Sequence, residues 1–462
     1  MKTHWVTRIW IPVAVSLAGC AHYPVNAPKT ANTEAGYYLR NHRRTDNSDE
    51  IILLMAFSGG GTRAASFSYG LLEALRDTTY ERNGQTRRLL DEVDVISSVS
   101  GGGFTSADYA LYGDGIFEIF EPAFLHRNVQ GTLVRKALNP LNWPALWSST
   151  YSISDIAAEY YDDILFKGAT FNDLRTNNTP HIIINTTDVS NGNRLSFNQE
   201  VFDIIASDVG SYRISRAVAA SSAVPGLLSP ITLNNYAGQY PITPPKWLQR
   251  SYNNREEDAV RIQAARMALY NDSTNSPYIH LVDGSASDNL GLRCYLDVSS
   301  IIQANPRLLS QLGKQDAIKK VVLISVNSFV HPKTGWDSRD SPPKSKEVGK
   351  AAGYRTMERY SEDTLVETRR LIRNMKARLE GEEEIRLYQI ELDFMKVKDP
   401  SRMRSLLSLP TSFSLHKDVV GELRQTARTL LYESAEFQRL IDDLDGTYPD
   451  MQEPEKKSKK WK

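Results

Sequence analysis

This sequence has few cysteines, no clusters of histidine and no excess of charge of either sign. Only two of its 462 residues are cysteines, and its eight histidines are scattered, none in a His-Glu-x-x-His pattern or paired with a cysteine. The sequence therefore predicts no metal site and no cofactor. Lysine plus arginine equals aspartate plus glutamate, at 55 each, so no overall charge indicates a nucleic-acid partner.

The first residues carry an apolar run that is too short to span a bilayer. Basic residues flank the start, and Ile9 to Ala18 form the run. Such a segment is typical of a signal peptide, which we expect over residues 1–19.

This segment closes with Leu17-Ala18-Gly19-Cys20, which resembles the lipobox of bacterial lipoproteins. The resemblance implies that Cys20 is acylated and becomes the mature N-terminus, and that Ala21 permits transfer to the outer membrane. We therefore expect an envelope protein anchored through Cys20 at the outer membrane and facing the periplasm. The alternative is an ordinary Cys20 beside a conventional cleavage site. If Cys20 is acylated, Cys294 has no partner, and the fold does not depend on disulfides.

Composition predicts one large domain with short extensions. Residues 20–50 are polar and predict a tether, and the domain is expected over residues 51–445. Ile231 to Pro277 hold several prolines and no strand pattern, which predicts a surface insertion. Residues 446–462 are basic towards their end and predict a disordered tail.

A glycine-rich turn follows the first strand of this domain. Ile51 to Phe57 is an unbroken apolar run, typical of a strand covered on both faces. Gly59, Gly60 and Gly61 follow, and apolar residues recur at helical spacing from Thr62. Backbone N–H groups without neighbouring Cβ atoms, near a helix N-terminus, predict an anion site. The turn matches neither the Walker pattern nor the dinucleotide fingerprint, and a simple connecting turn is the alternative.

A second strand runs directly into a serine. Val93 to Val99 is followed by Ser100 and three further glycines. A serine on a sharp strand-to-helix turn exposes its Oγ as a nucleophile, and crowding there demands small residues two positions away on each side. Ser98 and Gly102 hold these positions, although Ser98 stands where glycine is usual. A Ser-Gly turn without catalysis is the alternative.

Further strands are expected at residues 181–188, 278–282, 320–326 and 387–392, with a hairpin partner at 194–197. Because the carboxyl ends of parallel strands meet at one edge of a sheet, the glycine turn, Ser100 and Asp283 are expected together there. Helices are expected at residues 214–224, 351–380 and 417–431. The first of these consists of small residues, which suits packing near the serine turn.

The aromatic stretch from Phe117 to Trp147 has two interpretations. It is either a helical connection whose aromatics enter the core or a lipid-facing cap over the site.

Three elements in chain order, Ser58-Gly-Gly-Gly-Thr-Arg63, the Ser100 turn and Asp283-Gly284, resemble the patatin-like phospholipase family and its relatives in the cytosolic phospholipase A2 group. The resemblance extends over most of Ile51 to Val330. It implies a three-layer α/β fold around a mainly parallel central sheet. It also makes residues 51–445 a catalytic domain that hydrolyses lipid acyl esters, of the phospholipase A or lysophospholipase type, without a metal.

Residue by residue, the resemblance implies that Ser100 is the nucleophile and Asp283 the base. The N–H groups of Gly59, Gly60 and Gly61 are implied to hold the oxyanion. Arg63 matches the arginine after the glycines, where its charge would meet a lipid phosphate or support the loop.

Two positions depart from the family pattern. Ser98 replaces the first glycine of the elbow, and Ser285 replaces the glycine or alanine usual after Asp-Gly. Neither change removes a catalytic atom, so any effect falls on geometry and rate.

The sequence is also compatible with two other interpretations of the site. His331, in the loop after the strand at 320–326, would serve as base in a Ser-His-Asp triad. Alternatively, the chain is a non-catalytic envelope lipoprotein whose glycine turn binds an anionic headgroup. The lipid substrate itself is not specified by the sequence.

Overall fold

The computed structural model describes residues 21–42, 44–243, 245, 248, 258–304, 318–331, 335–382 and 385–450. The predicted signal peptide and Cys20 lie outside the described residues. In the described part of the chain, no helix combines the length and apolar character needed to cross a membrane.

A central sheet of eight strands organises the fold, in the order β12-β11-β2-β5-β6-β10-β9, with β7 paired to β6. Their bounds are β2 Ile51–Phe57, β5 Val93–Val99, β6 His181–Asp188, β7 Arg194–Phe197, β9 Ile231–Asn234, β10 Tyr278–Asp283, β11 Lys320–Asn327 and β12 Arg386–Asp393. The five strands from β12 to β6 are parallel, whereas β7, β9 and β10 pair antiparallel. Small sheets pair β1 Ala27–Pro28 with β8 Ser207–Asp208, and β13 Gly446–Thr447 with β3 Thr79–Arg82 and β4 Gln85–Arg88.

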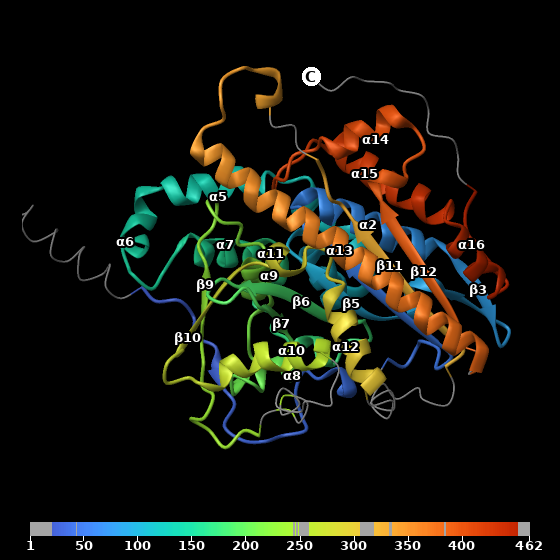
Figure 1. Cartoon of the computed structure of the whole chain (residues 1–462), viewed down its shortest axis with the longest axis horizontal. Helices are drawn as coiled ribbons and strands as arrows, with labels where there is room; N and C mark the ends of the chain where they lie inside the picture. Colours follow the sequence, from blue (N-terminus) through green and yellow to red (C-terminus); the bar gives the residue numbers. More distant parts are fainter. Residues whose placement is uncertain are drawn as a thin grey trace, which may run out of the picture.

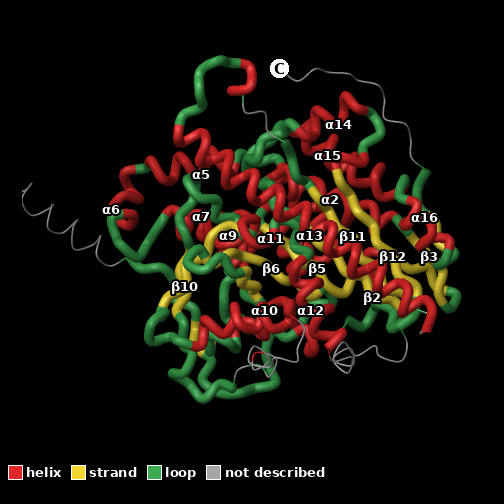
Figure 2. The backbone as a smooth tube through the Cα atoms, in the orientation of Figure 1, coloured by secondary structure: helices red, strands yellow, loops and turns green. Residues whose placement is uncertain are grey.

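Helices cover both faces of this sheet, as Figures 1 and 2 show. One layer contains α2 Thr62–Asp77, α3 Gly101–Tyr112, α9 Ile214–Ser221, α15 Lys417–Tyr432 and α16 Ala435–Asp442. The other contains α10 Asp258–Ala268, α11 Ser285–Asp288, α12 Arg293–Ala304 and the long α13 Ser345–Glu382. The remaining helices are α4 Ile116–Phe120, α5 Val129–Leu138, α6 Trp143–Leu146, α7 Ile153–Tyr161, α8 Gln199–Phe202 and α14 Pro400–Leu407.

The alternation of side chains along β2 explains the three layers. Leu53, Met55 and Phe57 enter the large core that the strand shares with α2, α3 and α15. Ala56 faces the other way, into a smaller core with Ile372 of α13. A strand that is apolar on both faces must be covered on both. The predicted three-layer α/β fold with a mainly parallel central sheet is therefore confirmed.

The predicted strands are all present, within one residue of the expected ends. The helices differ more at their boundaries. The helix of small residues ends at Ser221 rather than Val224, and the long helix begins at Ser345 rather than residue 351. Helix ends are set by capping and tertiary contacts, which periodicity does not record.

The segment Ile231 to Pro277 is not wholly a surface insertion. Its first residues form β9, the edge strand that pairs with β10. Ile231 and Leu233 are buried and alternate with more exposed neighbours. Four residues are too few for alternation to stand out in a sequence, which is why the strand was not expected.

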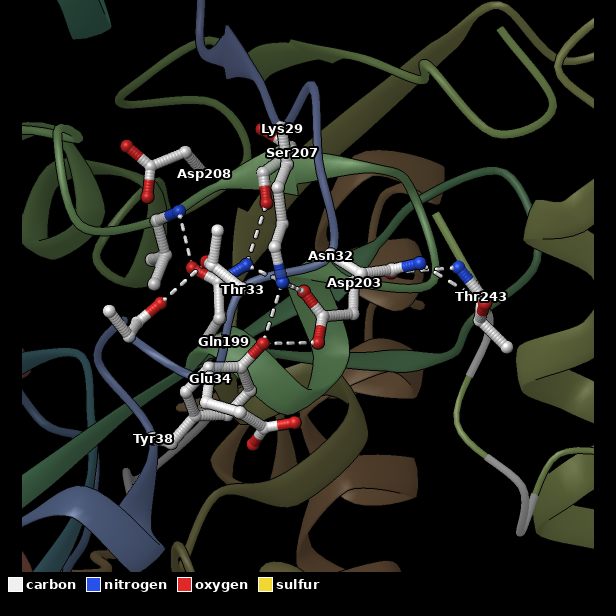
Figure 3. A network of polar contacts seen from close by, with 12 residues as sticks. Lys29, Asn32, Thr33, Glu34, Tyr38, Gln199, Asp203, Ser207, Asp208 and Thr243 are labelled. Carbon is white, nitrogen blue, oxygen red and sulfur yellow. Dashed lines mark hydrogen bonds and ion pairs between the residues drawn. The ribbon is translucent and has the colours of Figure 1, made fainter. Parts of the chain in front are cut away.

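Residues 20–50 were expected to be a tether, but much of this segment packs on the domain. Lys29 Nζ lies 2.6 Å from Asp203 Oδ1 and 2.6 Å from Tyr38 Oη, and Tyr38 donates to the same carboxylate (Figure 3). Tyr37 is part of the large core, and Asn26 bonds to β9. Polar residues of this segment such as Asn26 and Lys29 are thus buried and hydrogen-bonded inside the fold, and the packed domain begins before Ile51.

The predicted disordered tail over residues 446–462 is also wrong at its first residues. Gly446–Thr447 form β13 and pair with β3, so these residues are not part of a disordered tail. Residues 451–462 lie outside the described residues.

Candidate active site

Ser100 stands on a sharp turn between β5 and α3. Its backbone has φ 49° and ψ −118°, a conformation that a residue with a Cβ rarely adopts, and its side chain is buried. A Cβ at Gly101 would lie 2.1 Å from the carbonyl oxygen of Gly61, and one at Gly102 would lie 2.7 Å from Phe57 Cβ. The glycines after Ser100 therefore allow the helix to start against the neighbouring strand and loop. Strain of this kind is characteristic of functional turns.

The end of α9 holds this turn in place. The N–H of Ser100 donates to Ser221 Oγ at 2.8 Å, and Ser221 Oγ donates in turn to the carbonyl of Asn185 at 2.6 Å. The predicted position of the small-residue helix beside the serine turn is confirmed. Ser221 itself was not expected, since nothing in its sequence context separates it from its serine and alanine neighbours.

Asp283, the last residue of β10, faces Ser100. Ser100 Oγ donates to Asp283 Oδ2 at 2.8 Å, and the N–H of Ser285 donates to Asp283 Oδ1 at 2.8 Å. Burial raises the pKa of the Asp283 carboxyl above its usual value, and the hydrogen bonds from Ser285 and Ser100 oppose this rise. A carboxylate with a raised pKa accepts a proton more readily.

The expected reason for this convergence was wrong in one respect. β10 runs antiparallel to β6, so Asp283 does not arrive at a common carboxyl edge of parallel strands. Instead, Val99 pairs with Asn185 and Asp283 pairs with Thr186, so two strands of opposite direction end beside adjacent residues of β6. An apolar strand pattern carries no information on direction, which is why the sequence did not reveal this.

The glycine loop offers two donors rather than three. The N–H of Gly59 is already bonded to the carbonyl of Asn289 at 2.9 Å, which corrects the expectation that it binds an oxyanion. Within the described ranges, the N–H groups of Gly60 and Gly61 have no protein acceptor. These glycines have φ of 140° and 62°, and a Cβ at Gly61 would lie 2.4 Å from the carbonyl oxygen of Ser412. Only glycine fits there.

Arg63 supports the glycine loop through buried hydrogen bonds to neighbouring segments. Its side chain is buried, Nε donates to the carbonyl of Ser328 at 2.8 Å, and Nη1 donates to the carbonyls of Leu409 at 3.2 Å and Pro410 at 2.9 Å. Burial lowers the pKa of Arg63 to about 10. Of the two expected roles, loop support accounts for these contacts.

Replacing Arg63 by methionine should therefore destabilise the protein. The three carbonyls that it bonds would lose a buried donor, at a cost of about 1–3 kcal/mol in the free energy of unfolding. Chemical denaturation of the variant measures this. If stability is unchanged while KM rises only for phosphate-bearing substrates, Arg63 is instead a phosphate ligand.

His331, the alternative base, has other partners. Its Nδ1 lies 2.7 Å from Glu358 Oε1 on α13, and its side chain is 42% exposed. Its backbone N–H donates to the carbonyl of Leu407. The hydrogen bond of Ser100 Oγ goes to Asp283. Across the described residues, no three His, Cys, Asp or Glu side chains gather as metal ligands.

The two departures from the expected pattern are accommodated locally. Ser98 Oγ of β5 bonds to Ser106 Oγ of α3 at 2.7 Å, so the hydroxyl has a buried partner between the strand and the helix. The side chains of Ser285 and Asn289 lie close to Gly59, where a Cβ would come within 2.4 Å of Ser285 Oγ. Ser285 and Asn289 thus join the glycine loop to the Asp283 segment, contacts that a sequence motif does not reveal.

Comparison with known proteins places this geometry in context. The sequence model described as patatin-like phospholipase matches residues 55–293. Among solved structures, human GIVD cytosolic phospholipase A2 is similar at 12% identity and a TM-score of 0.44, over 86% of this chain and 62% of that one. VipD from Legionella pneumophila is similar at 12% identity and a TM-score of 0.26, over 90% of this chain and 73% of that one. The chain thus spans about three fifths of the length of the human enzyme, and no curated protein sequence matches it.

Proposed function

The chain belongs to the patatin-like phospholipase family, and we propose that it hydrolyses acyl esters of membrane lipids with a Ser100–Asp283 dyad. The 2.8 Å hydrogen bond from Ser100 Oγ to Asp283 Oδ2 is the observation that carries this proposal. Supporting it are the strained turn under Ser100 and the unoccupied N–H groups of Gly60 and Gly61 in the described loop.

The geometry supports a two-step reaction. Asp283 takes the proton of Ser100 as Oγ attacks the acyl carbon, and the developing oxyanion accepts hydrogen bonds from the N–H groups of Gly60 and Gly61. The tetrahedral intermediate expels the alcohol, which receives the proton from Asp283. Water, activated by the same carboxylate, then releases the fatty acid and restores Ser100.

An acyl-release assay over a panel of diacyl phospholipids, lysophospholipids and neutral esters tests this function. Fatty acid should be released from at least one of these lipids by the unsubstituted chain. Release by none of them, from a folded protein, would contradict the proposal and favour the lipid-binding alternative.

His331 should be dispensable for this reaction. Its imidazole pairs with Glu358 and has no part in the proton transfer, so His331→Ala should retain more than about half of the activity. The measurement is kcat with the best substrate of the panel. A loss as complete as that caused by removing the Ser100 hydroxyl would instead establish a triad.

The site of action in this proposal is a membrane of the bacterial envelope. Cys20, at the end of the lipobox-like Leu-Ala-Gly-Cys, is the proposed acylation site, and the chain would face the periplasm from the outer membrane. Two or three acyl chains anchor a protein durably, whereas a single chain does not. Mass spectrometry of the N-terminal peptide tests the modification.

A further inference from the structure

Large apolar side chains are exposed along the segment that contains α5 and α6. Leu141 is 86% exposed, Leu138 68% and Trp147 65%, and Val134 and Trp143 are exposed as well. We call these five residues the α5–α6 patch. Exposed apolar clusters of this kind mark surfaces that contact a partner or a membrane.

The outer face of α5 is apolar where a surface helix is normally polar. Val129 and Leu133 are buried and hold the helix to the domain, while Val134 and Leu138, four residues apart, are exposed. A helix with only solvent on its outer face carries polar residues there. The exposed pair thus indicates a second apolar environment outside the protein. Phe120 and Phe124 enter the core, as the first interpretation of this aromatic stretch expects, whereas Trp147 is exposed.

The charge of this segment has one sign. From Pro122 to Ser154 the sequence contains no aspartate or glutamate, whereas Arg127, Arg135 and Lys136 are present. Both arginines are exposed. Basic residues beside leucine and tryptophan suit a bilayer surface with anionic headgroups, where tryptophan occupies the interfacial layer.

The first described residues, at the start of the chain, lie in space against residues 148–150, which follow α6 in the sequence. The carbonyl of Ala21 accepts hydrogen bonds from Ser148 Oγ at 2.6 Å and Thr150 Oγ1 at 3.2 Å, and the N–H of Tyr23 donates to the carbonyl of Thr150. Figure 1 shows the start of the described chain beside α6, at the opposite end of the molecule from α16. Ala21, the residue to which the proposed acylation site is covalently joined, therefore lies next to the α5–α6 patch.

The same segment is connected to the glycine loop. Gln130 Oε1 of α5 accepts hydrogen bonds from Ser412 Oγ and from the N–H of Phe413. The carbonyl of Ser412 accepts the N–H of Thr62, the residue that follows Gly61. A single intervening loop thus joins the helix that bears the patch to the proposed oxyanion donors.

We propose that the α5–α6 patch is the surface through which the protein docks on a lipid bilayer with anionic headgroups. The inference rests on the proposed function in that this bilayer supplies the acyl ester. Leu138, Leu141 and Trp147 enter the interfacial layer, and Arg135 and Lys136 meet the headgroups. Docking through the α5–α6 patch would turn the side of the glycine loop that lies nearest to this patch towards the membrane.

Depth measurement with nitroxide labels tests this surface without reference to catalysis. The full chain carrying Leu141→Cys is labelled and reconstituted in vesicles of phosphatidylethanolamine and phosphatidylglycerol. Ala435→Cys, exposed on α16, is the matched control. The unsubstituted chain gives the background from Cys20 and Cys294.

The label at position 141 should be accessible to oxygen and at least about fivefold less accessible to a water-soluble nickel chelate than the label at position 435. Equal accessibility to the chelate at both positions would overturn the proposal, even if Cys20 is acylated. Protection of position 141 that is the same without vesicles would also overturn it, by indicating contact with a second copy of the chain.

A kinetic comparison supplies the second readout. The double variant Leu141→Ser and Trp147→Ser should lower kcat/KM for phospholipid in vesicles by about tenfold or more, because apolar area no longer leaves water on docking. Hydrolysis of a soluble short-chain ester should be unchanged. Val366→Ser, which removes an exposed apolar side chain on α13 away from the patch, is the control and should behave like the unsubstituted chain.

Equal losses on both substrates, or no loss on vesicles, would count against the docking surface. An unsubstituted chain that hydrolyses neither substrate would contradict the proposed function instead, and the nitroxide result would still decide the docking surface.

Discussion

Ser100→Ala should abolish acyl hydrolysis, lowering kcat by about 10⁴-fold or more. In the proposed mechanism the hydroxyl supplies the atom that becomes acylated, and alanine has no atom that can take its place. The side chain hydrogen-bonds to Asp283 and is buried, so its loss removes the nucleophile with little change in volume. The measurement is fatty-acid release from the best lipid substrate, with the fold checked by circular dichroism.

Ser222→Ala is the matched control for this variant. Ser222 is also buried near the turn, but its Oγ donates to the carbonyl of Val218 within α9. This variant should retain activity within about threefold. Retention of more than a tenth of the activity by Ser100→Ala would contradict the assignment of the nucleophile.

Asp283→Asn should lower kcat by about 10³-fold or more while leaving the protein folded. The amide is nearly the same size and still accepts the hydrogen bond from the N–H of Ser285, but it does not take a proton from Ser100. In the proposed mechanism Asp283 moves a proton and does not hold the ester, so KM should change much less than kcat. Parallel measurement of kcat and KM separates loss of a base from loss of substrate binding.

The pH dependence of kcat/KM is the control for this role. The base must be unprotonated, and burial raises the pKa of Asp283, so activity should fall as pH decreases through that raised value. The fall should therefore begin at a higher pH than for an ordinary aspartate. The residual activity of Asp283→Asn should lack this acidic limb, and persistence of the limb would assign it to another group.

The sequence predicted those parts of the fold that local pattern determines. The unbroken apolar run at β2, the Val- and Ile-containing stretch at β5 and the glycines after both indicated strands, turns and a covered sheet, and all are present. The direction of β10 and the short strand β9 were not predicted, because pairing direction and four-residue strands leave little periodic signal. The packing of Lys29 and Tyr38 was missed because polar residues that are hydrogen-bonded inside a fold resemble solvated ones in composition.

In the candidate active site, too, the sequence predicted the residues at strand ends but not the tertiary hydrogen bonds around them. Ser100 and Asp283 were singled out correctly as neighbours because each lies at a strand end with glycine beside it. The occupation of the Gly59 N–H by Asn289, and the support of Ser100 by Ser221, depend on contacts between segments far apart in the chain. Such hydrogen bonds are tertiary, and no spacing rule encodes them.

Site mapping with a fluorophosphonate probe tests whether Asp283 activates Ser100 as a nucleophile. We expect a single adduct, on Ser100, in mass spectrometry of the digested protein. Labelling should be slowed strongly in Asp283→Asn and unchanged in His331→Ala. An adduct on another serine, or labelling of Ser100 at an undiminished rate in folded Asp283→Asn, would contradict it.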